Sequence, residues 1–435
     1  MIKATAAPVS LICSEGLACV PPRIQPEKRI KGIAKVRYTR KRIIPFSWSL
    51  FLSLTMSIMI KTASSTSTAA YRNGWTPRAA TSIALMAMVC GCDDAEAMQA
   101  WGEANAEWLE GFLETPHGPP TQEVFLAVFG ALNPEAFSAV FRAWAELLAL
   151  RLKAMGKHVA VDGKTSRRSF DIASGKSAVH TVSAYMSEAG LVIGQCKTEA
   201  KSNEITAIPE LLRLLDLRGA TVTIDAMGCQ TEIVETIREG EGHFLLAVKD
   251  NQPTLLKDLQ ATFAEAEDPR QRTVDEQPRP SMEVSEQIEK GHGRLETRRL
   301  SLCRDLAWVT TAERWCGLHF VARIVRQRTV LATGKTSIET SYTIGSDEAA
   351  TAADVAQAIR RHWGVENQLH WVLDLAFRED EARHRARNTA ENMTTLRHFA
   401  LDIIKSDKKR KLGVANTRKR AGWDRSYLIE LLTGA

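Results

Sequence analysis

The sequence predicts an α/β fold, in which a mixed sheet flanked by helices follows an all-helical N-terminal region. Apolar residues first recur at helical spacing, between Ile83 and Leu148. Five short β-rich runs follow, the first three in hairpin order and the last two alternating with helical patterns. Helical spacing returns from Ala352 onward.

The N-terminal helical domain is predicted at residues 81–150. Its first helical pattern ends near Trp108, and after the turn PHGPP a second pattern begins at Thr121. Asn133 followed by Pro134 is typical of a third helix start, because Asn caps free N–H groups and Pro fits the first turn. No polar cluster in this region points to chemistry, so we interpret it as a packing or docking domain.

The β-rich runs predict a five-stranded sheet, most of it within residues 151–267. The runs are 158–162, 178–186, 191–198, 220–226 and 243–249. The second and third runs are joined by Ser-Glu-Ala-Gly, which predicts a hairpin. The later runs alternate with helical patterns, as in sheets that helices cover.

This pattern is interrupted at residues 268–346, where three prolines, short β-like runs and many arginines predict a β-rich insertion. Residues 347–405 are predicted to complete the core with helices. The last segment, 406–435, is predicted to be a basic tail with a short helix. Such a run of cations either follows a phosphate backbone or is only solvated.

Composition excludes several classes of protein. Of the 435 residues, 44% are hydrophobic and 25% charged, which is too apolar for a disordered chain. The eight cysteines include no C-x-x-C pair, which argues against a disulfide scaffold and a zinc site. The net charge is +6, but residues 1–80 hold 13 Lys and Arg against two Glu. Residues 81–435 are therefore net acidic, so DNA affinity there requires cations clustered on one face.

Residues 1–80 form a basic and apolar extension with no predicted fold. The uncharged run 43–60 follows the basic segment RYTRKR, which is the charge order of a membrane anchor. The run is short for a bilayer span and contains Pro45 and several Ser residues. A membrane anchor is therefore the less favoured interpretation.

Two aspartates stand at the ends of predicted strands. Asp162 ends HVAVD, and Asp225 ends ATVTID. A carboxylate at the tip of an apolar strand is costly unless it is hydrogen-bonded, paired or bound to a metal. Each of them alone could instead cap a turn.

Glu366 lies on an apolar helical stripe. Steps of three and four residues lead from Val355 to Leu373 through otherwise apolar positions and include Glu366. This placement predicts that the charge faces the core of the domain. Glu366 is then either a buried acid paired with an Arg such as Arg361, or a metal ligand.

Three such acids have a chemical use if they converge. Cutting or transferring a phosphodiester requires stabilised charge on the attacking and leaving oxygens, which two Mg²⁺ ions about 3.5 to 4 Å apart can supply. Mg²⁺ takes hard oxygen ligands such as carboxylates. No side chain then needs to act as the nucleophile.

Blocks of the sequence around these acids carry a family signature. They are VAVDGKTSRRSFD (159–171), TVTIDAMGCQTEI (221–233) with HFLLAVKDNQPTL (243–255), and IRRHWGVENQLHWVLDLAFRED (359–380) with ENMTTLRHFALDIIK (391–405). These blocks resemble the DDE transposases of bacterial insertion sequences, and among them the H-repeat-associated proteins. The resemblance runs from about Ile83 to the last helix.

The resemblance implies an RNase H-like fold whose catalytic and metal-binding residues are Asp162, Asp225 and Glu366, with two Mg²⁺ ions, or Mn²⁺, as cofactor. Relatives often carry a Tyr and a Lys around the last acid, but Ile359 and Leu373 stand at those places here. The end-clamping roles of the Tyr and Lys are therefore not carried over. Residues 1–80 do not resemble the family, which favours upstream read-through or a frameshift as their origin.

Ten residues are predicted to contact DNA. They are Lys164, Arg167, Arg168, Lys249, Arg294, Arg298, Arg361, Trp363, Lys409 and Arg410. The cations after Asp162 could meet phosphates beside the metals or form a solvated basic turn. Arg294 and Arg298 share one strand face. Trp363 could stack on a splayed base or be a core aromatic.

We therefore expect a transposase that cleaves the ends of its own element and joins them to target DNA. Its expected partners are double-stranded DNA, at the terminal inverted repeats and at the target, and a second copy of the chain on that DNA. The expected location is the bacterial cytoplasm. Two alternatives stay open: a nuclease of the same fold that does not join DNA, and a catalytically decayed DNA-binding protein.

Overall fold

The computed structural model describes residues 77–113, 115, 117–152, 158–170, 175, 177–198, 204–270, 278–409 and 412–434. All structural statements below concern these residues. The run 43–60, nearly all of the segment 1–80, and Arg410 lie outside the described residues, so the expectations about them stay predictions.

In the described part of the chain, five helices precede the first strand. They are α3 (Pro77–Val89), α4 (Ala95–Ala104), α5 (Ala106–Glu110), α6 (Gln122–Ala131) and α7 (Pro134–Arg151). Side-chain caps explain two of the starts. The Asp94 carboxylate accepts a hydrogen bond from Ala97 N–H, and the Asn133 side chain accepts one from Ala136 N–H. The helix start at Asn133 is the one that the sequence predicts.

The predicted mixed sheet is confirmed, and its first five strands match the predicted runs. They are β1 (His158–Thr165), β2 (His180–Met186), β3 (Leu191–Lys197), β4 (Thr221–Ile224) and β5 (His243–Val248). The pairs β1–β4 and β4–β5 are parallel, whereas β1–β2 and β2–β3 are antiparallel. The order of these strands is β3-β2-β1-β4-β5.

The insertion extends the same sheet, so the sheet is larger than the five strands predicted. Its strands are β6 (Glu283–Gly291), β7 (Arg294–Cys303), β8 (Phe320–Val330) and β9 (Thr336–Gly345), with a 3-10 turn, η2 (Ala312–Arg314), between β7 and β8. β9 pairs antiparallel with β5, and the nine strands follow the order β3-β2-β1-β4-β5-β9-β8-β7-β6. The physical reason is that β5 would otherwise present an edge of unpaired backbone groups.

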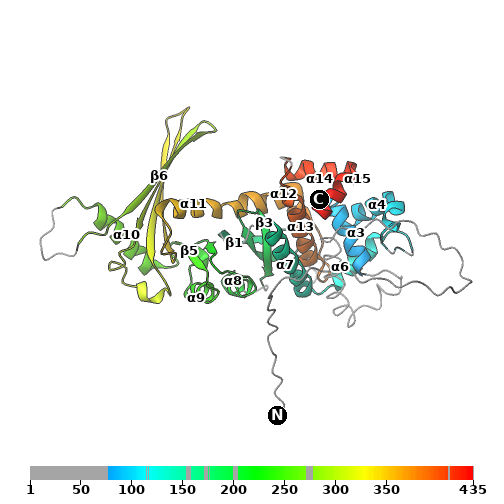
Figure 1. Ribbon diagram of the computed structural model, residues 1–435, viewed down its shortest axis with the longest axis horizontal. Coiled ribbons are helices and arrows are strands. Elements are labelled where there is room, and N and C mark those ends of the chain that lie inside the picture. The colour runs from blue at the N-terminus through cyan, green and yellow to red at the C-terminus, as the bar shows by residue number, and fades with distance from the viewer. Residues whose placement is uncertain are drawn as a thin grey trace, which may run out of the picture. The chain divides into compact units, whose positions relative to one another are not determined.

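Helices cover both faces of the sheet. α8 (Glu204–Leu212), α9 (Thr231–Glu239) and α10 (Pro253–Glu267) pack on the face that carries Val159 and Val161. α11 (Ala352–His362) crosses the other face and contacts β6, β7, β5, β4 and β1 (Figure 1). A capping box of Thr351 and Asp354 begins α11.

The chain after α11 is helical, with interruptions. It contains a π-helical turn, η3 (Val365–His370), then α12 (Trp371–Ala376), the 3-10 turn η4 (Glu379–Glu381), α13 (Thr389–Ser406), α14 (Val414–Trp423) and α15 (Arg425–Thr433). The predicted basic tail is therefore largely two packed helices. Its Arg418 is buried, donates to Met88 O in α3, and pairs with Asp93.

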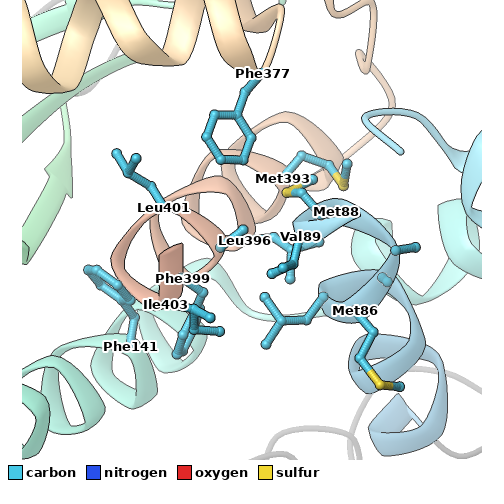
Figure 2. Packing of buried hydrophobic residues seen from close by; sticks show 14 of the residues in the cluster. Met86, Met88, Val89, Phe141, Phe377, Met393, Leu396, Phe399, Leu401 and Ile403 are labelled. Carbon is cyan, nitrogen blue, oxygen red and sulfur yellow. The ribbon is translucent and has the colours of Figure 1, made fainter. Parts of the chain in front are cut away.

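One hydrophobic cluster joins the N-terminal helices to α13. It includes Met86 and Met88 of α3 together with Phe399 of α13, as Figure 2 shows. The ring centroid of Phe399 lies 4.9 Å from that of Phe141 and 5.7 Å from that of Phe137, both in α7. α13 is buried nearly all round, as expected for the central helix of a core. The helices of residues 81–150 therefore share their core with α13.

Among the described helices, none is by itself long and apolar enough to cross a membrane. The pair α6 and α7 passes the same test of length and composition only when both are counted together, and they are bent by 91° relative to each other.

Phe399→Ala is expected to lower the free energy of unfolding by about 3–5 kcal/mol, because it leaves a cavity among packed aromatic rings. Urea unfolding followed by circular dichroism measures the change. Leu150→Ala is the control, since Leu150 is exposed and its truncation should change stability by no more than about 0.5 kcal/mol. Equal stability of Phe399→Ala and the wild type would contradict this packing.

Candidate functional site

Asp162, Asp225 and Glu366 line one cleft of about 680 Å³, together with three further acids, Glu339, Asp374 and Asp380. Asp162 lies in β1, Asp225 directly follows β4, and Glu366 lies in η3. β1 and β4 are parallel neighbours paired up to Val161 and Ile224. Each aspartate is the next residue after that pair, so both stand at the same end of the sheet, where open α/β sheets place their sites.

The carboxylates are close enough for their charges to interact. The pKa of Asp162 is raised to about 7, mainly by burial and further by the negative charges of Glu204, Asp225 and Glu366. A hydrogen bond of 2.9 Å from Gly163 N–H to Asp162 Oδ1 opposes the rise in pKa. The Asp162 carboxyl therefore keeps its proton to a higher pH than an exposed aspartate does.

Gly163 allows the close approach of Glu204 to β1. A Cβ atom at this position would lie 2.2 Å from Glu204 Oε1 and 2.5 Å from His180 Nε2, so any larger residue would require both side chains to move. His180 and Glu204 are themselves paired at 2.7 Å. Because neighbouring residues of a strand point to opposite faces, this pair lies on the far side of β1 from Asp162.

Asp225 caps a turn, as the alternative interpretation of its sequence position predicts. Its Oδ1 accepts a hydrogen bond of 3.0 Å from Met227 N–H, at the start of the 3-10 turn η1 (Ala226–Gly228). The cap holds one carboxylate oxygen in place. A role as a turn cap and a role in the cleft are therefore compatible, because the same carboxylate also lines the cleft.

The prediction that Glu366 faces the core is wrong, because Glu366 is exposed at the cleft. The helical stripe assumes a regular α-helix, but η3 is π-helical, and Trp371 N–H bonds to Glu366 O, five residues back instead of four. Val365 and Leu369 are buried in its place. The proposed pairing with Arg361 is also wrong, since Arg361 pairs with Glu188 at 2.7 Å.

Two side chains from other elements hold the π-helical turn. The Tyr185 hydroxyl in β2 donates to Gln368 Oε1 at 2.9 Å. Lys405 Nζ in α13 donates to Gln368 O at 2.6 Å, and to the Tyr185 hydroxyl at 3.0 Å. These bonds tie the segment that carries Glu366 to the sheet and to the core helix.

His362 and His370 also line the cleft. Neither was predicted as a site residue from the sequence. His370 Nδ1 lies 3.6 Å from Asp162 Oδ2. Burial lowers the pKa of His370 to about 3 and also lowers that of His362. Both rings are therefore neutral at neutral pH. The sequence signal that could have found His370 is the repeated His-Trp pair on either side of Glu366.

The donor atoms of the cleft suit Mg²⁺. Carboxylate oxygens are the side-chain ligands that this ion prefers, and within the described ranges no Lys or Arg forms an ion pair with Asp162, Asp225 or Glu366. The same residues contain no group of three or more His, Cys, Asp or Glu already arranged as around a metal ion. The three acids are candidate ligands only by residue type and by the cleft that they share.

Some of the predicted DNA contacts are engaged within the protein. Lys164, Arg298 and Arg361 each form ion pairs with carboxylates. The partners are Asp374, Glu379 and Asp380 for Lys164, Glu289 and Glu296 for Arg298, and Glu188 for Arg361. A phosphate would have to displace these carboxylates.

Other predicted DNA contacts are exposed. They are Arg167, Arg168, Lys249, Arg294, Trp363 and Lys409. Of these, Arg167 also forms an ion pair, with its Nε 3.3 Å from Asp380 Oδ2. Lys249 and Trp363 line the cleft itself. Trp363 is 52% exposed, so the alternative that its ring belongs to the core is wrong, and Trp371, the other Trp near Glu366, is 61% exposed.

A second hollow, of about 730 Å³, adjoins the cleft and shares Arg326 and Trp363 with it. Its walls are α11 and strands of the insertion, and Arg360 also lines it. Arg360 pairs with Glu289 of β6, so α11 is tied to the insertion. Sequence reasoning missed Arg360, because nothing in the sequence separates it from its neighbour Arg361.

Two family models match this chain. The family described as "Transposase DDE domain" matches residues 153–403, and the one described as "DDE_Tnp_1-associated" matches residues 79–145. The first match covers more than half of the chain and includes the three cleft carboxylates. The chain therefore belongs to the family of DDE transposases.

Relatives from Escherichia coli (strain K12) confirm the resemblance to the H-repeat-associated proteins. The chain is 35% identical over 373 residues to "H repeat-associated putative transposase YhhI", covering 84% of this chain and 95% of that protein. It is 36% identical over 357 residues to "Putative protein YbfL", covering 81% and 91%. A piggyBac transposase in a synaptic complex with hairpin DNA is a distant structural likeness, with a TM-score of 0.39, 11% identity, and coverage of 91% and 83%.

In the metal-free protein, Asp162 is expected to titrate near pH 7. Asp225→Asn and Glu366→Gln each remove a negative charge that raises the pKa of Asp162, so each should lower that pKa, while burial keeps it above the ordinary value of about 3.9. NMR of ¹³C-labelled aspartate carboxyls measures the pKa. Asp216→Asn is the control, because Asp216 pairs with Arg218 outside the cleft. An unchanged pKa in both cleft variants would show that the acids do not converge.

Proposed function

We propose that this protein cleaves DNA at the ends of its own element and joins the freed 3′ hydroxyls to target DNA. In this proposal Asp162, Asp225 and Glu366 hold two Mg²⁺ ions, or Mn²⁺ in their place. The observation that carries the proposal is the meeting of three carboxylates, from β1, β4 and η3, in one cleft. Like charges gathered without a paired cation favour binding of metal ions.

An RNase H-like core is part of the proposal. The order β3-β2-β1-β4-β5, with an antiparallel hairpin beside three parallel strands, supports it. The proposed division of the chain places a helical domain at 81–150 and the catalytic core at 151–267 and 347–405. The insertion at 268–346 lies between the two parts of the core. Residues 406–435 follow the second part.

The bound ions would stabilise charge on the attacking and leaving oxygens of a phosphodiester and activate a water or a 3′ hydroxyl. The chain's part is to hold the three carboxylates on rigid elements. A strand pair fixes Asp162 and Asp225, and the bonds of Tyr185 and Lys405 fix the turn that carries Glu366. The buried cleft histidines, being neutral, add no positive charge beside the ions.

We propose that DNA lies across the exposed cations at the rim of the cleft. Lys249 lines the cleft, and Arg168 follows the strand that carries Asp162. The exposed ring of Trp363 offers a stacking surface to an unpaired base. Arg298 already pairs with carboxylates, so it would contribute less to binding.

The partners in this proposal are the terminal inverted repeats, the target DNA and a second copy of the chain. Each copy offers one such cleft in its described residues, so cutting and joining two ends together calls for two copies on the DNA. The location that goes with these partners is the bacterial cytoplasm.

A nuclease of the same fold is the second candidate, because the same carboxylates would serve hydrolysis alone. A strand-transfer assay with precut DNA ends separates the two functions. The proposal expects joined products, whereas the nuclease would leave precut ends unjoined. A decayed DNA-binding protein would bind the ends and neither cut nor join them.

Asp225→Asn and Glu366→Gln are expected to reduce end cleavage by at least about 10³-fold, because each removes a metal-binding carboxylate worth several kcal/mol of charge stabilisation. Cleavage of labelled element ends in Mg²⁺ measures the loss, and gel-shift titration in Ca²⁺ should show that DNA binding is retained. Asp216→Asn, outside the cleft, is the control. Wild-type cleavage by either variant would remove that residue from the site.

Arg168→Ala and Lys249→Ala are each expected to weaken DNA binding and to reduce the slope of log affinity against log salt by about 1, as for one lost phosphate contact. Fluorescence anisotropy between about 50 and 200 mM salt measures the slope. Arg218→Ala is the matched control, since Arg218 is an exposed arginine paired with Asp216. An unchanged slope in both variants would move the DNA path away from this rim.

A further inference from the structure

We propose that Lys164 is a positioning residue, which holds the strand that carries Asp162 against the helical segment that carries Glu366. It does so through the carboxylates of Asp374, Glu379 and Asp380. This inference rests on the proposed role of Asp162 and Glu366 as metal ligands. It assigns Lys164 a contact within the protein in place of the predicted contact with DNA phosphates.

The geometry of the ammonium group supports this assignment. Lys164 Nζ lies 2.7 Å from Asp374 Oδ1, 3.4 Å from Asp380 Oδ1 and 3.6 Å from Glu379 Oε2. Three carboxylates therefore surround one positive charge, and the ammonium donates a hydrogen bond to Asp380 Oδ1. Its side chain is only 12% exposed, which leaves little access for a phosphate.

The contacts of Lys164 join β1, which carries Asp162, to the helical segment that carries Glu366. The spacing of these two elements sets the distance between the two proposed metal ligands. Lys164 stands two residues after Asp162 on β1, so both side chains point to the same face of the sheet. Asp374 lies on α12, which continues directly from the π-helical turn of Glu366. The ion pair from Lys164 to Asp374 therefore crosses from the strand to the helix beside the cleft, and both residues line that cleft.

A second layer of contacts fixes the carboxylates. The side chain of Glu379 is 1% exposed; its Oε1 accepts a hydrogen bond from the Thr394 hydroxyl at 3.2 Å and lies 3.6 Å from Arg397 Nη1. Both of these partners belong to α13. Asp380 accepts a bond of 3.3 Å from Arg167 N–H, just beyond β1. The contacts of Lys164 thus connect β1, α12 and the core helix.

Removal of Lys164 alone would leave three carboxylates short of one positive charge at a poorly solvated place. Their repulsion would be relieved by movement of α12 and η4 away from β1. Glu366 would move with that segment, and the spacing of the metal-binding oxygens would change. Loss of a residue that orients metal ligands without itself binding the metal typically reduces metal affinity by about 10- to 100-fold.

The test is Mn²⁺ binding to the full chain without DNA, measured by electron paramagnetic resonance of free Mn²⁺. Lys164→Met is expected to reduce Mn²⁺ affinity by about 10- to 100-fold, and Lys164→Arg to restore part of it because the charge remains. Lys197→Met is the matched control, since Lys197 joins β3 to Glu391 of α13 at 3.1 Å away from the cleft. It should leave Mn²⁺ affinity unchanged.

A double-mutant cycle separates positioning from general destabilisation. Asp374→Asn should also weaken Mn²⁺ binding, and the combined Lys164→Met and Asp374→Asn variant should lose less than the sum of the two single losses, because they break one contact. Additive losses would overturn the proposal. Asp374→Asn and Lys164→Arg keep the test decisive if Lys164→Met does not fold, as judged by circular dichroism.

The remaining outcomes distinguish this inference from the proposed function. Wild-type protein that binds no Mn²⁺ would overturn the metal site itself and the inference with it. Wild-type binding with unchanged affinity in Lys164→Met would overturn the positioning role alone. A Lys164→Met variant that keeps its Mn²⁺ affinity but loses DNA affinity in metal-free buffer would return Lys164 to the predicted phosphate contact.

Discussion

Repulsion among like charges in one cleft is the constraint on which the rest of the structure depends. Asp162, Asp225 and Glu366 line the same space without a paired Lys or Arg in the described residues. Burial raises the pKa of Asp162, and the negative charges of Glu204, Asp225 and Glu366 add to the rise. Such an arrangement is unfavourable in the metal-free protein, so the elements that carry the acids must be held by other contacts.

The extended sheet supplies part of that support. Because β9 pairs with β5, the insertion continues the sheet that carries the two aspartates. α11 then crosses from β6 to β1 and leads into the turn of Glu366 (Figure 1). Its Arg360 pairs with Glu289 of β6, so the helix is fixed at the insertion as well as at the core.

The basic residues of the chain fall into two groups with different physical roles. One group, which includes Lys164, Arg298 and Arg418, pairs with carboxylates and joins elements that are distant in the sequence. The other, which includes Arg168 and Lys249, is exposed near the cleft. A count of charges along the chain cannot separate the groups, because the separation depends on which acids the fold brings near each cation.

The sequence by itself determined the first five strands and the positions of both aspartates, because apolar runs and the acids at their ends are local features. It did not determine the place of Glu366, since the π-helical turn is held by Tyr185 and Lys405, which lie far away in the sequence. The nine-stranded sheet and the buried Arg418 likewise depend on distant partners. Tertiary structure decided these features because their contacts exist only once remote segments have packed together.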